Sequence, residues 1–439
     1  MLVEIQKNQI KPNDLESYFD RLWPILRSIT GEGFRKSLRI LQEILPYEIE
    51  SIASGTSVFD WTVPQEWKIT EAFIANKEGE KVIDIKNNNL HVLNYSTAVD
   101  SLVKLEDLQE HLYSLEDLPE AIPYVTSYYQ RRWGFCLSHN QRIQLCDEEY
   151  LVKIEAEHFD GQLNWGHKVI PATNSSKKEF LLSSYLCHPS MANNELSGPI
   201  LLSFLGKLIS QLPERNFNYR LMIVPETIGS ISYLSKYGEE IKDNCVGGLV
   251  ATCVADEHAW NYKKSKQGDS AIDKICMNLM NFSGLKNYKI HDFFPTGSDE
   301  RQFCSPAFDL PVGSITRSMY THYKEYHTSL DNKDFISFEA FQESIEFYMK
   351  VILCFESFGK YENLNPHCEP MLGKRNLYHS IGAANKTKLS QNAFLYLLSF
   401  SDGEHDLVDI ANKMKISLYE LLPFIKALVD AKLLKKIEE

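Results

Sequence analysis

The sequence lacks the common signals of a membrane or secreted protein. No apolar run approaches the roughly 20 residues that a membrane-spanning helix needs. The first residues, MLVEIQKNQIKPNDLE, lack the basic, apolar and small-residue series of a signal peptide. The nine cysteines include no C-x-x-C pair, and several lie in apolar runs, as buried, reduced thiols do. We therefore expect a cytoplasmic protein with no membrane contact.

Positive charge is also scarce. The 46 lysines and arginines stand against 59 aspartates and glutamates, which leaves a net charge of −13. Such a chain repels phosphates, so we expect no nucleic acid as a partner. The length of 439 residues and the hydrophobic fraction of 44% predict two or three globular domains.

Strands and helices alternate from Tyr150 onward. Strand-like runs such as FLLSSYL, YRLMIVP and GGLVATCVA are separated by helix-like segments such as PILLSFLGKLISQL. This alternation predicts an α/β fold with a mixed, mostly parallel sheet and helices on both faces. The segments at 150–159 and 163–172 are expected to pair with each other as antiparallel strands.

One strand leads directly into a histidine. The stretch SSYLCHPSMANNELSG, residues 183–198, continues a buried strand and reaches Pro189, which has no N–H to give the sheet. His188 is therefore expected at the carboxyl end of a strand, where ligand sites of open α/β sheets usually lie. A polar loop then leads to a helix that begins near Ser197. A histidine with a purely structural role in a turn is the alternative.

The composition divides the chain into three predicted domains. A discontinuous catalytic domain covers 1–55 and 147–372, and a β-rich inserted domain covers 56–146. The insert contains aromatic clusters that we expect to form part of its core: Trp61 with Trp67, and Tyr128, Tyr129, Trp133 and Phe135. Three helices at 386–439 predict a winged helix-turn-helix domain after a linker at 373–384.

The predicted winged helix is poorly suited to DNA. Residues 386–439 contain eight lysines, eight acidic residues and no arginine. The helix at about 417–430 contains no arginine, asparagine or glutamine, the side chains that read base edges. We expect this domain to pack on the rest of the chain or to bind a protein partner.

Polar side chains that suit metal chemistry follow several of the strands. Histidines and carboxylates at one sheet edge suit zinc, and a further glutamate suits a general base. A strand-end glutamate taken alone is more often an exposed cap. The residues concerned are His188, Asn194, Glu195, Glu226, Asp299, Glu300 and His327.

These residues follow an order that resembles a known family. The pattern H…A-N-x-x-x-S-G…E-x-x-G…S-D…Y-H-T-x-x-D is similar to that of zinc aminopeptidases with a co-catalytic metal pair, over roughly 14–55 and 150–357. Nearly the whole chain resembles the bacterial aminopeptidase-like proteins associated with polysaccharide biosynthesis. The resemblance implies the phosphorylase/hydrolase-like fold of zinc peptidases, with a β-rich insert and a terminal winged helix.

The resemblance assigns roles to individual residues. His188 and His327 match the two metal histidines, and Glu226 matches the base that deprotonates the metal-bound water. Asp299 matches the aspartate of a Ser-Asp-His triplet, with Glu300 in place of the histidine. Three metal carboxylates of the family fall on neutral residues here, namely Asn194, Thr227 and Thr252.

That loss of negative charge argues against two metal ions. Two zinc ions carry four positive charges, which amides and hydroxyls do not offset. We therefore expect one zinc ion per chain, bound by His188, His327 and a carboxylate, for which Glu195 is the best candidate. Asn194, Thr227, Thr252, Asp299 and Glu300 would bind the metal or line the site.

The resulting prediction is a single-zinc hydrolase that acts on a small peptide or another amide. Two alternatives stay open from the sequence. The chain is a non-catalytic sensor of a peptide or sugar on the same fold, or it is a deacylase or cyclising transferase of a polysaccharide pathway. The fold alone does not choose between them, because function depends on the site.

Overall fold

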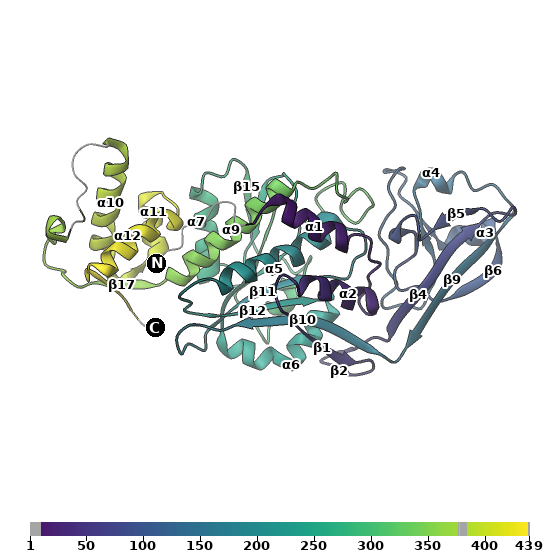
Figure 1. Cartoon of the computed structure of the whole chain (residues 1–439), viewed down its shortest axis with the longest axis horizontal. Coiled ribbons are helices and arrows are strands. Elements are labelled where there is room, and N and C mark those ends of the chain that lie inside the picture. Colours follow the sequence, from purple (N-terminus) through teal and green to yellow (C-terminus); the bar gives the residue numbers. More distant parts are fainter. Residues whose placement is uncertain (1–9, 376, 378–383, 438–439) are drawn as a thin grey trace.

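The computed structural model describes residues 10–375, 377 and 384–437. The molecule is elongated, with the β-rich insert at one end, the large sheet and its helices in the middle, and the C-terminal helices at the other end (Figure 1). Most of the predicted linker at 373–384 lies outside the described residues. The domain boundaries remain a prediction.

The centre of the molecule is an eight-stranded mixed sheet. Its strands β12, β11, β13 and β16 are parallel neighbours, and β14 and β15 form a second parallel pair. The other pairs are antiparallel, so the predicted fold class is confirmed. The strands follow the order β1 (Glu48–Ala53), β10 (Gln162–Ile170), β12 (Asn218–Val224), β11 (Glu179–Tyr185), β13 (Cys245–Ala251), β16 (Val312–Thr316), β14 (Trp260–Lys263) and β15 (Tyr288–His291).

The two faces of this sheet bury different hydrophobic cores. Successive side chains of a strand point to opposite faces. In β11, Phe180 and Leu182 pack in one core while Leu181 packs in the other. The first core also contains side chains of α1 (Pro12–Leu22), α2 (Glu32–Leu41), α5 (Ser197–Ser210), α7 (Ala271–Phe282) and α9 (Phe338–Ser357). The second core contains side chains of α6 (Ile228–Asn244) and of the insert.

Three strands of the predicted insert form a four-stranded antiparallel sheet with β9, which lies just beyond the predicted boundary at residue 146. Its order is β5 (Lys81–Asp84), β4 (Glu66–Ala75), β9 (Glu149–Phe159) and β6 (Val99–Lys104). The predicted pairing of 150–159 with 163–172 is therefore wrong. β9 pairs with β4 and β6, whereas β10 pairs with β1 and β12 in the central sheet. Alternating burial marks a segment as a strand but does not specify its partner.

Short elements complete the insert. They are β2 (Ser57–Val58), β3 (Trp61–Thr62), η1 (Asn89–His91), α3 (Leu105–Leu108), η2 (Gln109–His111), β7 (Leu112–Tyr113), β8 (Phe135–Cys136) and α4 (His139–Arg142).

The prediction that the aromatic clusters of the insert are core residues holds for Trp67 and Phe135, which are buried. It is wrong for Trp61 and Tyr129, which are 37% and 58% exposed.

The C-terminal part is a winged helix-turn-helix, as predicted. A three-stranded sheet of order β18-β17-β19 supports its helices. β17 precedes the predicted linker in the chain, whereas β18 and β19 follow it. The sheet therefore pairs strands from both sides of the linker. The elements are β17 (Lys360–Asn363), α10 (Ala384–Phe400), β18 (Asp402–Asp406), α11 (Leu407–Met414), α12 (Leu418–Asp430) and β19 (Leu434–Lys436). The short helix η4 (Leu372–Arg375) precedes α10.

The winged helix packs on the central part. Leu421 and Leu428 of α12 are buried in the same core as residues of α9 and α7. The side chain of Asn278 in α7 accepts the N–H of Leu418 at 2.6 Å and donates to Asn412 at 2.8 Å. One side of α12, the helix that would enter a DNA groove, is therefore occupied by protein.

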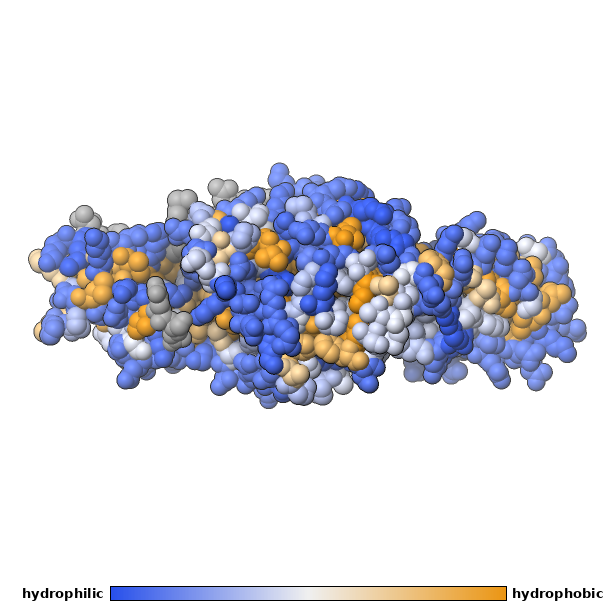
Figure 2. Space-filling model, turned by 90° about the horizontal axis from the view of Figure 1, so that it is seen from below, coloured by the Kyte–Doolittle hydropathy of each residue, from blue (hydrophilic) through white to orange (hydrophobic). Residues whose placement is uncertain are grey.

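None of the described helices has both the length and the apolar character to cross a bilayer. The face in Figure 2 is mostly hydrophilic, with separate hydrophobic patches over the winged-helix end, the middle and the insert.

Candidate functional site

The predicted site residues converge at the carboxyl edge of the central sheet. His188 follows β11, Glu226 follows β12 and Thr252 follows β13. Because these three strands are parallel neighbours, their ends meet at one edge. His327 comes from the loop before α9, and Asp299 directly precedes the short helix α8 (Glu300–Phe303).

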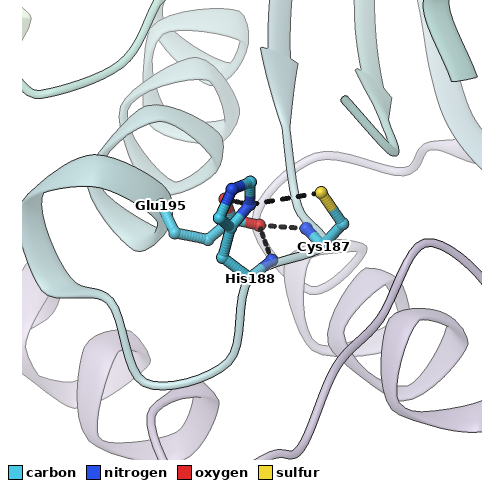
Figure 3. Close-up of side chains that lie close together, drawn as sticks. All are labelled: Cys187, His188 and Glu195. Atoms are coloured by element: carbon cyan, nitrogen blue, oxygen red, sulfur yellow. Dashed lines mark hydrogen bonds and ion pairs between the residues drawn. The ribbon is translucent and has the colours of Figure 1, made fainter. Parts of the chain in front are cut away.

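The carboxylate of Glu195 lies on the Nδ1 side of the His188 imidazole. It lies in a π-helical turn, η3 (Ala192–Leu196), between the loop and α5, and such turns are frequent at functional sites. Its Oε1 accepts the backbone N–H groups of Cys187 and, at 2.8 Å, of His188. Its Oε2 lies 2.8 Å from Nδ1 of His188, and the same nitrogen is hydrogen-bonded to Sγ of Cys187 at 3.2 Å (Figure 3). The other ring nitrogen, Nε2, is thereby directed away from Glu195.

Glu226 and His327 lie on the Nε2 side of His188. The Glu226 carboxylate is 3.7 Å from Nε2, and the ring centroids of the two histidines are 5.2 Å apart. The structure therefore brings the two histidines and the proposed base together. His327 has a left-handed backbone (φ 55°), and its ring stacks on Tyr326 at 3.9 Å.

Tyr124 of the insert packs against the rings of both histidines. Its ring lies 4.6 Å from that of His188 and 5.3 Å from that of His327. Its backbone N–H donates to the carbonyl of His327 at 2.8 Å. Sequence reasoning missed Tyr124, because no local pattern links residue 124 to strand ends that follow it by 60 residues or more.

Burial shifts the pKa values of the site strongly. It raises the pKa of Glu226 well above the usual value, and the nearby carboxylates of Asp299 and Glu195 raise it further. Burial also raises the pKa of Asp299 to about 7. Burial and the Arg27 charge lower the pKa of His188 to about 3, while burial and His188 lower the pKa of His327. Burial thus favours the uncharged forms of these side chains.

Asp299 organises the turn that follows Glu226. Its Oδ1 accepts the N–H of Thr227 at 2.8 Å and the hydroxyl of Ser230 at 2.9 Å. Thr227 has a left-handed backbone (φ 64°), and its hydroxyl accepts a hydrogen bond from Nη2 of Arg301 at 2.8 Å. Sequence reasoning also missed Arg301, which follows the predicted site residues Asp299 and Glu300 directly.

Asn194 and Thr252 are engaged with their neighbours. The amide of Asn194 donates to the Tyr185 hydroxyl at 2.9 Å, and the Thr252 hydroxyl donates to the Asn194 carbonyl at 2.7 Å. Asp331 accepts the N–H groups of Asn193 and Asn194 at 2.7 and 2.9 Å. These contacts hold the π-helical turn.

Glu300 belongs to a separate ion pair. Its Oε1 lies 2.6 Å from Nζ of Lys263 and accepts the Tyr320 hydroxyl at 2.9 Å. Both Glu300 and Lys263 are completely buried. Removing either partner would leave an uncompensated buried charge. We assign this pair a structural role.

The side chains at this edge include histidine, cysteine and carboxylate donors, the types that bind zinc. In the described part of the chain, one group of three side chains has its possible metal-binding atoms within 4.8 Å of one another. These side chains are Cys187, His188 and Glu195. Oε1 of Glu195 already accepts two backbone N–H groups, and its Oε2 faces Nδ1 of His188. We therefore favour the Nε2 side of His188 as the position of a metal ion. Three buried oxygens of the candidate residues, Oδ1 of Asn194, Oε2 of Glu195 and Oδ2 of Asp299, have no hydrogen-bond partner among the described residues. Histidines and unsatisfied oxygens fit a cation.

Known sequences and structures resemble the whole chain. Residues 17–357 match the family described as a domain of unknown function (DUF4910), and residues 359–436 match a winged helix-turn-helix family. A Clostridium acetobutylicum protein is 43% identical over 99% of this chain and 98% of its own length. Its name describes a polysaccharide biosynthesis protein with an aminopeptidase-like domain.

Solved structures show the same fold. A crystal structure from Clostridium acetobutylicum, named as a peptidase, is 42% identical with a TM-score of 0.89, over 97% of this chain and 96% of its own. A zinc aminopeptidase from Bacillus subtilis has a TM-score of 0.55 at 12% identity, over 78% and 94%. A peptidase M28 precursor from Shewanella amazonensis has a TM-score of 0.55 at 12% identity, over 79% and 92%. At this identity the last two show the fold alone.

Proposed function

Since the chain belongs to the DUF4910 family and has an aminopeptidase-like fold, we propose that it is a zinc-dependent hydrolase that cleaves an amide bond. One observation carries this proposal. Glu195 occupies the Nδ1 side of His188, and the free Nε2 faces Glu226 at 3.7 Å with His327 beside it. A carboxylate behind a metal-binding histidine is the usual arrangement of zinc sites.

Nε2 of His188 and the imidazole of His327 would hold one zinc ion in this proposal. Glu195 changes role, from the ligand expected at first to the residue that orients His188. Zinc would supply an activated water and polarise the amide carbonyl. Asn194 and Thr252, which are bonded to neighbours, would line the site without binding metal.

The chain's own residues would handle the protons. Glu226 would take a proton from the attacking water and return it to the leaving amine. Burial raises its pKa above the usual value, which makes its carboxylate a stronger base than that of an ordinary glutamate. Tyr124 would limit the access of bulk water, because its ring covers both histidines.

The name of the Clostridium acetobutylicum relative supports a substrate from polysaccharide biosynthesis. We propose a saccharide-linked amide in preference to a free peptide, which makes a deacylase one form of the reaction. All nine cysteines are free, which is consistent with the proposed reducing cytoplasm.

A non-catalytic sensor is the second candidate. The side chains of Asn194, Tyr185 and Thr252 are hydrogen-bonded among themselves and to the backbone. Asn194 and Thr252 occupy positions where the zinc aminopeptidases that the chain resembles have metal-binding carboxylates, which favours the sensor. The deciding experiment is turnover of a panel of aminoacyl amides and N-acetylated sugars by the zinc-loaded protein. Release of amine by the protein but not by a Glu226→Gln variant supports the hydrolase. Binding of a panel member without turnover supports the sensor.

A further inference from the structure

A cavity of about 560 Å³ lies between α2 and the four-stranded sheet that contains β4 and β9 (Figure 1). Residues from 24–35 form one wall, and residues of β4, the turn after β5 and the end of β9 form the other. Cavities of this size hold small molecules in many proteins. The described residues that line it do not include His188, Glu226 or His327, so it is distinct from the candidate metal site.

Two lysines bring unpaired positive charge to this cavity. Lys68 of β4 and Lys86 after β5 both line it, and in the described part of the chain neither ammonium lies within 4 Å of a carboxylate. The third cation of the walls, Arg35, is already paired with Glu66 at 2.7 Å and with Glu32 at 2.9 Å. The cavity therefore has an excess of positive charge, although the whole chain carries −13.

The N-terminus of α2 adds backbone donors. This helix of ten residues begins within the sequence TGEG, residues 30–33, and all four residues line the cavity. The first N–H groups of a helix have no partner within the helix, and no side chain caps this one. Gly31 has a left-handed backbone (φ 99°), which favours glycine there. A glycine-containing turn that leads into a helix is a common way to bind phosphate.

A buried hydroxyl beside this turn has no partner. Ser28 lines the same cavity and is 1% exposed, and its Oγ makes no hydrogen bond in the described part of the chain. Burying an unpaired hydroxyl costs free energy, which a ligand that accepts its hydrogen bond would recover. Leu26, Ile69 and Phe159 give the cavity an apolar surface as well. The walls thus combine donors for an anion with contacts for an apolar ring.

Two hydrogen-bonded contacts connect the cavity to the loop that carries His188. Arg27, within the lining segment 24–35, donates to the His188 carbonyl from Nε at 3.3 Å and from Nη2 at 3.2 Å. Nδ2 of Asn89, a lining residue, donates to the Ser190 hydroxyl at 3.0 Å. The cavity is therefore a neighbour of the candidate metal site, and an experiment must tell the two apart.

We propose that this cavity binds an organic diphosphate, such as a nucleoside diphosphate. The ammonium groups of Lys68 and Lys86, the first N–H groups of α2 and the Ser28 hydroxyl would bind the phosphate oxygens. The apolar surface would contact the ring of the organic part. A diphosphate carries more than one negative charge, which suits two lysines better than a single carboxylate does. The proposal does not depend on the proposed hydrolase activity.

Isothermal titration of the full-length protein tests the ligand class. The probes are UDP, uridine, which keeps the base and sugar without the phosphates, and inorganic pyrophosphate. UDP should bind about 10- to 100-fold tighter than uridine, as expected for charged hydrogen bonds. It should also bind several-fold tighter than pyrophosphate, which makes no contact with the apolar surface. Equal affinity for UDP and uridine, or for UDP and pyrophosphate, would overturn the organic diphosphate.

Lysine variants test the position of the probe. Lys68→Gln and Lys86→Gln should each weaken UDP binding about 10-fold, because each removes one charged partner of the phosphates. Lys104→Gln is the matched control, since Lys104 is an exposed lysine of β6 outside the cavity. It should leave the affinity unchanged. Unchanged UDP affinity in both Lys68→Gln and Lys86→Gln would overturn the assignment.

Two further variants separate binding from folding and from the metal site. Ser28→Ala removes an unpaired hydroxyl, so its thermal midpoint should not decrease, while UDP should bind several-fold more weakly. His188→Ala should keep the UDP affinity. Loss of UDP binding in His188→Ala would place the probe at the metal site and overturn the cavity. Tighter binding of citrate than of UDP would overturn the phosphate and assign the cavity to carboxylates.

Discussion

Oε2 of Glu195 lies 2.8 Å from Nδ1 of His188, and its Oε1 accepts the backbone N–H of the same histidine at 2.8 Å. This carboxylate therefore holds the backbone of the residue that we propose as the first metal ligand, and it lies against the ring nitrogen that Sγ of Cys187 also contacts at 3.2 Å. These contacts on the Nδ1 side leave Nε2 as the ring nitrogen that is directed toward Glu226.

The first prediction concerns this contact. Glu195→Leu should reduce zinc affinity about 10- to 100-fold, the usual cost of losing the group behind a metal histidine. Glu195→Gln, which keeps an acceptor oxygen, should lose less. Competition with a chromophoric chelator measures the affinities. An unchanged affinity in Glu195→Leu would show that His188 does not depend on Glu195 for metal binding.

The second prediction is the metal content. The protein should bind about one zinc ion per chain, because the site offers two histidines and lacks the carboxylates for a second ion. Elemental analysis after dialysis should show that His188→Ala and His327→Ala lose the metal. His258→Ala is a matched control, since its side chain is 64% exposed. Two ions per chain would contradict the assignment.

The third prediction concerns the base. Glu226→Gln should lower kcat by roughly two to four orders of magnitude, the usual contribution of general acid–base catalysis. The variant should keep its zinc and its thermal midpoint. Glu257→Gln, at an exposed position, should keep full activity. An active Glu226→Gln enzyme would remove Glu226 from the mechanism.

The fourth prediction is a pH dependence of stability. Burial raises the pKa of Asp331 from 3.8 to about 7, so the folded chain binds this proton more tightly than the unfolded chain. The stabilisation is complete below about pH 4 and is lost as the pH rises through about 7. The free energy of unfolding of wild type minus Asp331→Asn, in metal-free protein, should therefore decrease across this window. Urea titrations at several pH values measure it, and a constant difference would contradict the prediction.

The fifth prediction concerns the winged helix. The full-length protein should show no sequence-specific DNA binding tighter than micromolar at moderate salt, by fluorescence anisotropy. Residues 386–439 carry no net charge, and α12 packs against α9. A protein needs unpaired basic side chains to release counterions from DNA. Specific binding at nanomolar concentrations would show that α12 leaves this position.

The sequence alone determined the α/β class, the winged helix and the position of His188 after a buried strand. These features are local, because the alternation of apolar residues and a strand-ending proline follow from backbone geometry. The order of His188, Glu226 and His327 along the chain also located the region of the site. The parallel neighbours β11 and β12 bring the first two to one edge.

Only the tertiary structure decided which side chains meet there. It placed Glu195 beside Nδ1 of His188, paired Glu300 with Lys263, and brought Tyr124 from the insert against His188. It also separated β9 and β10 into different sheets. Periodicity records which face of a segment is buried, but the partner on that face is set by packing between segments distant in the chain.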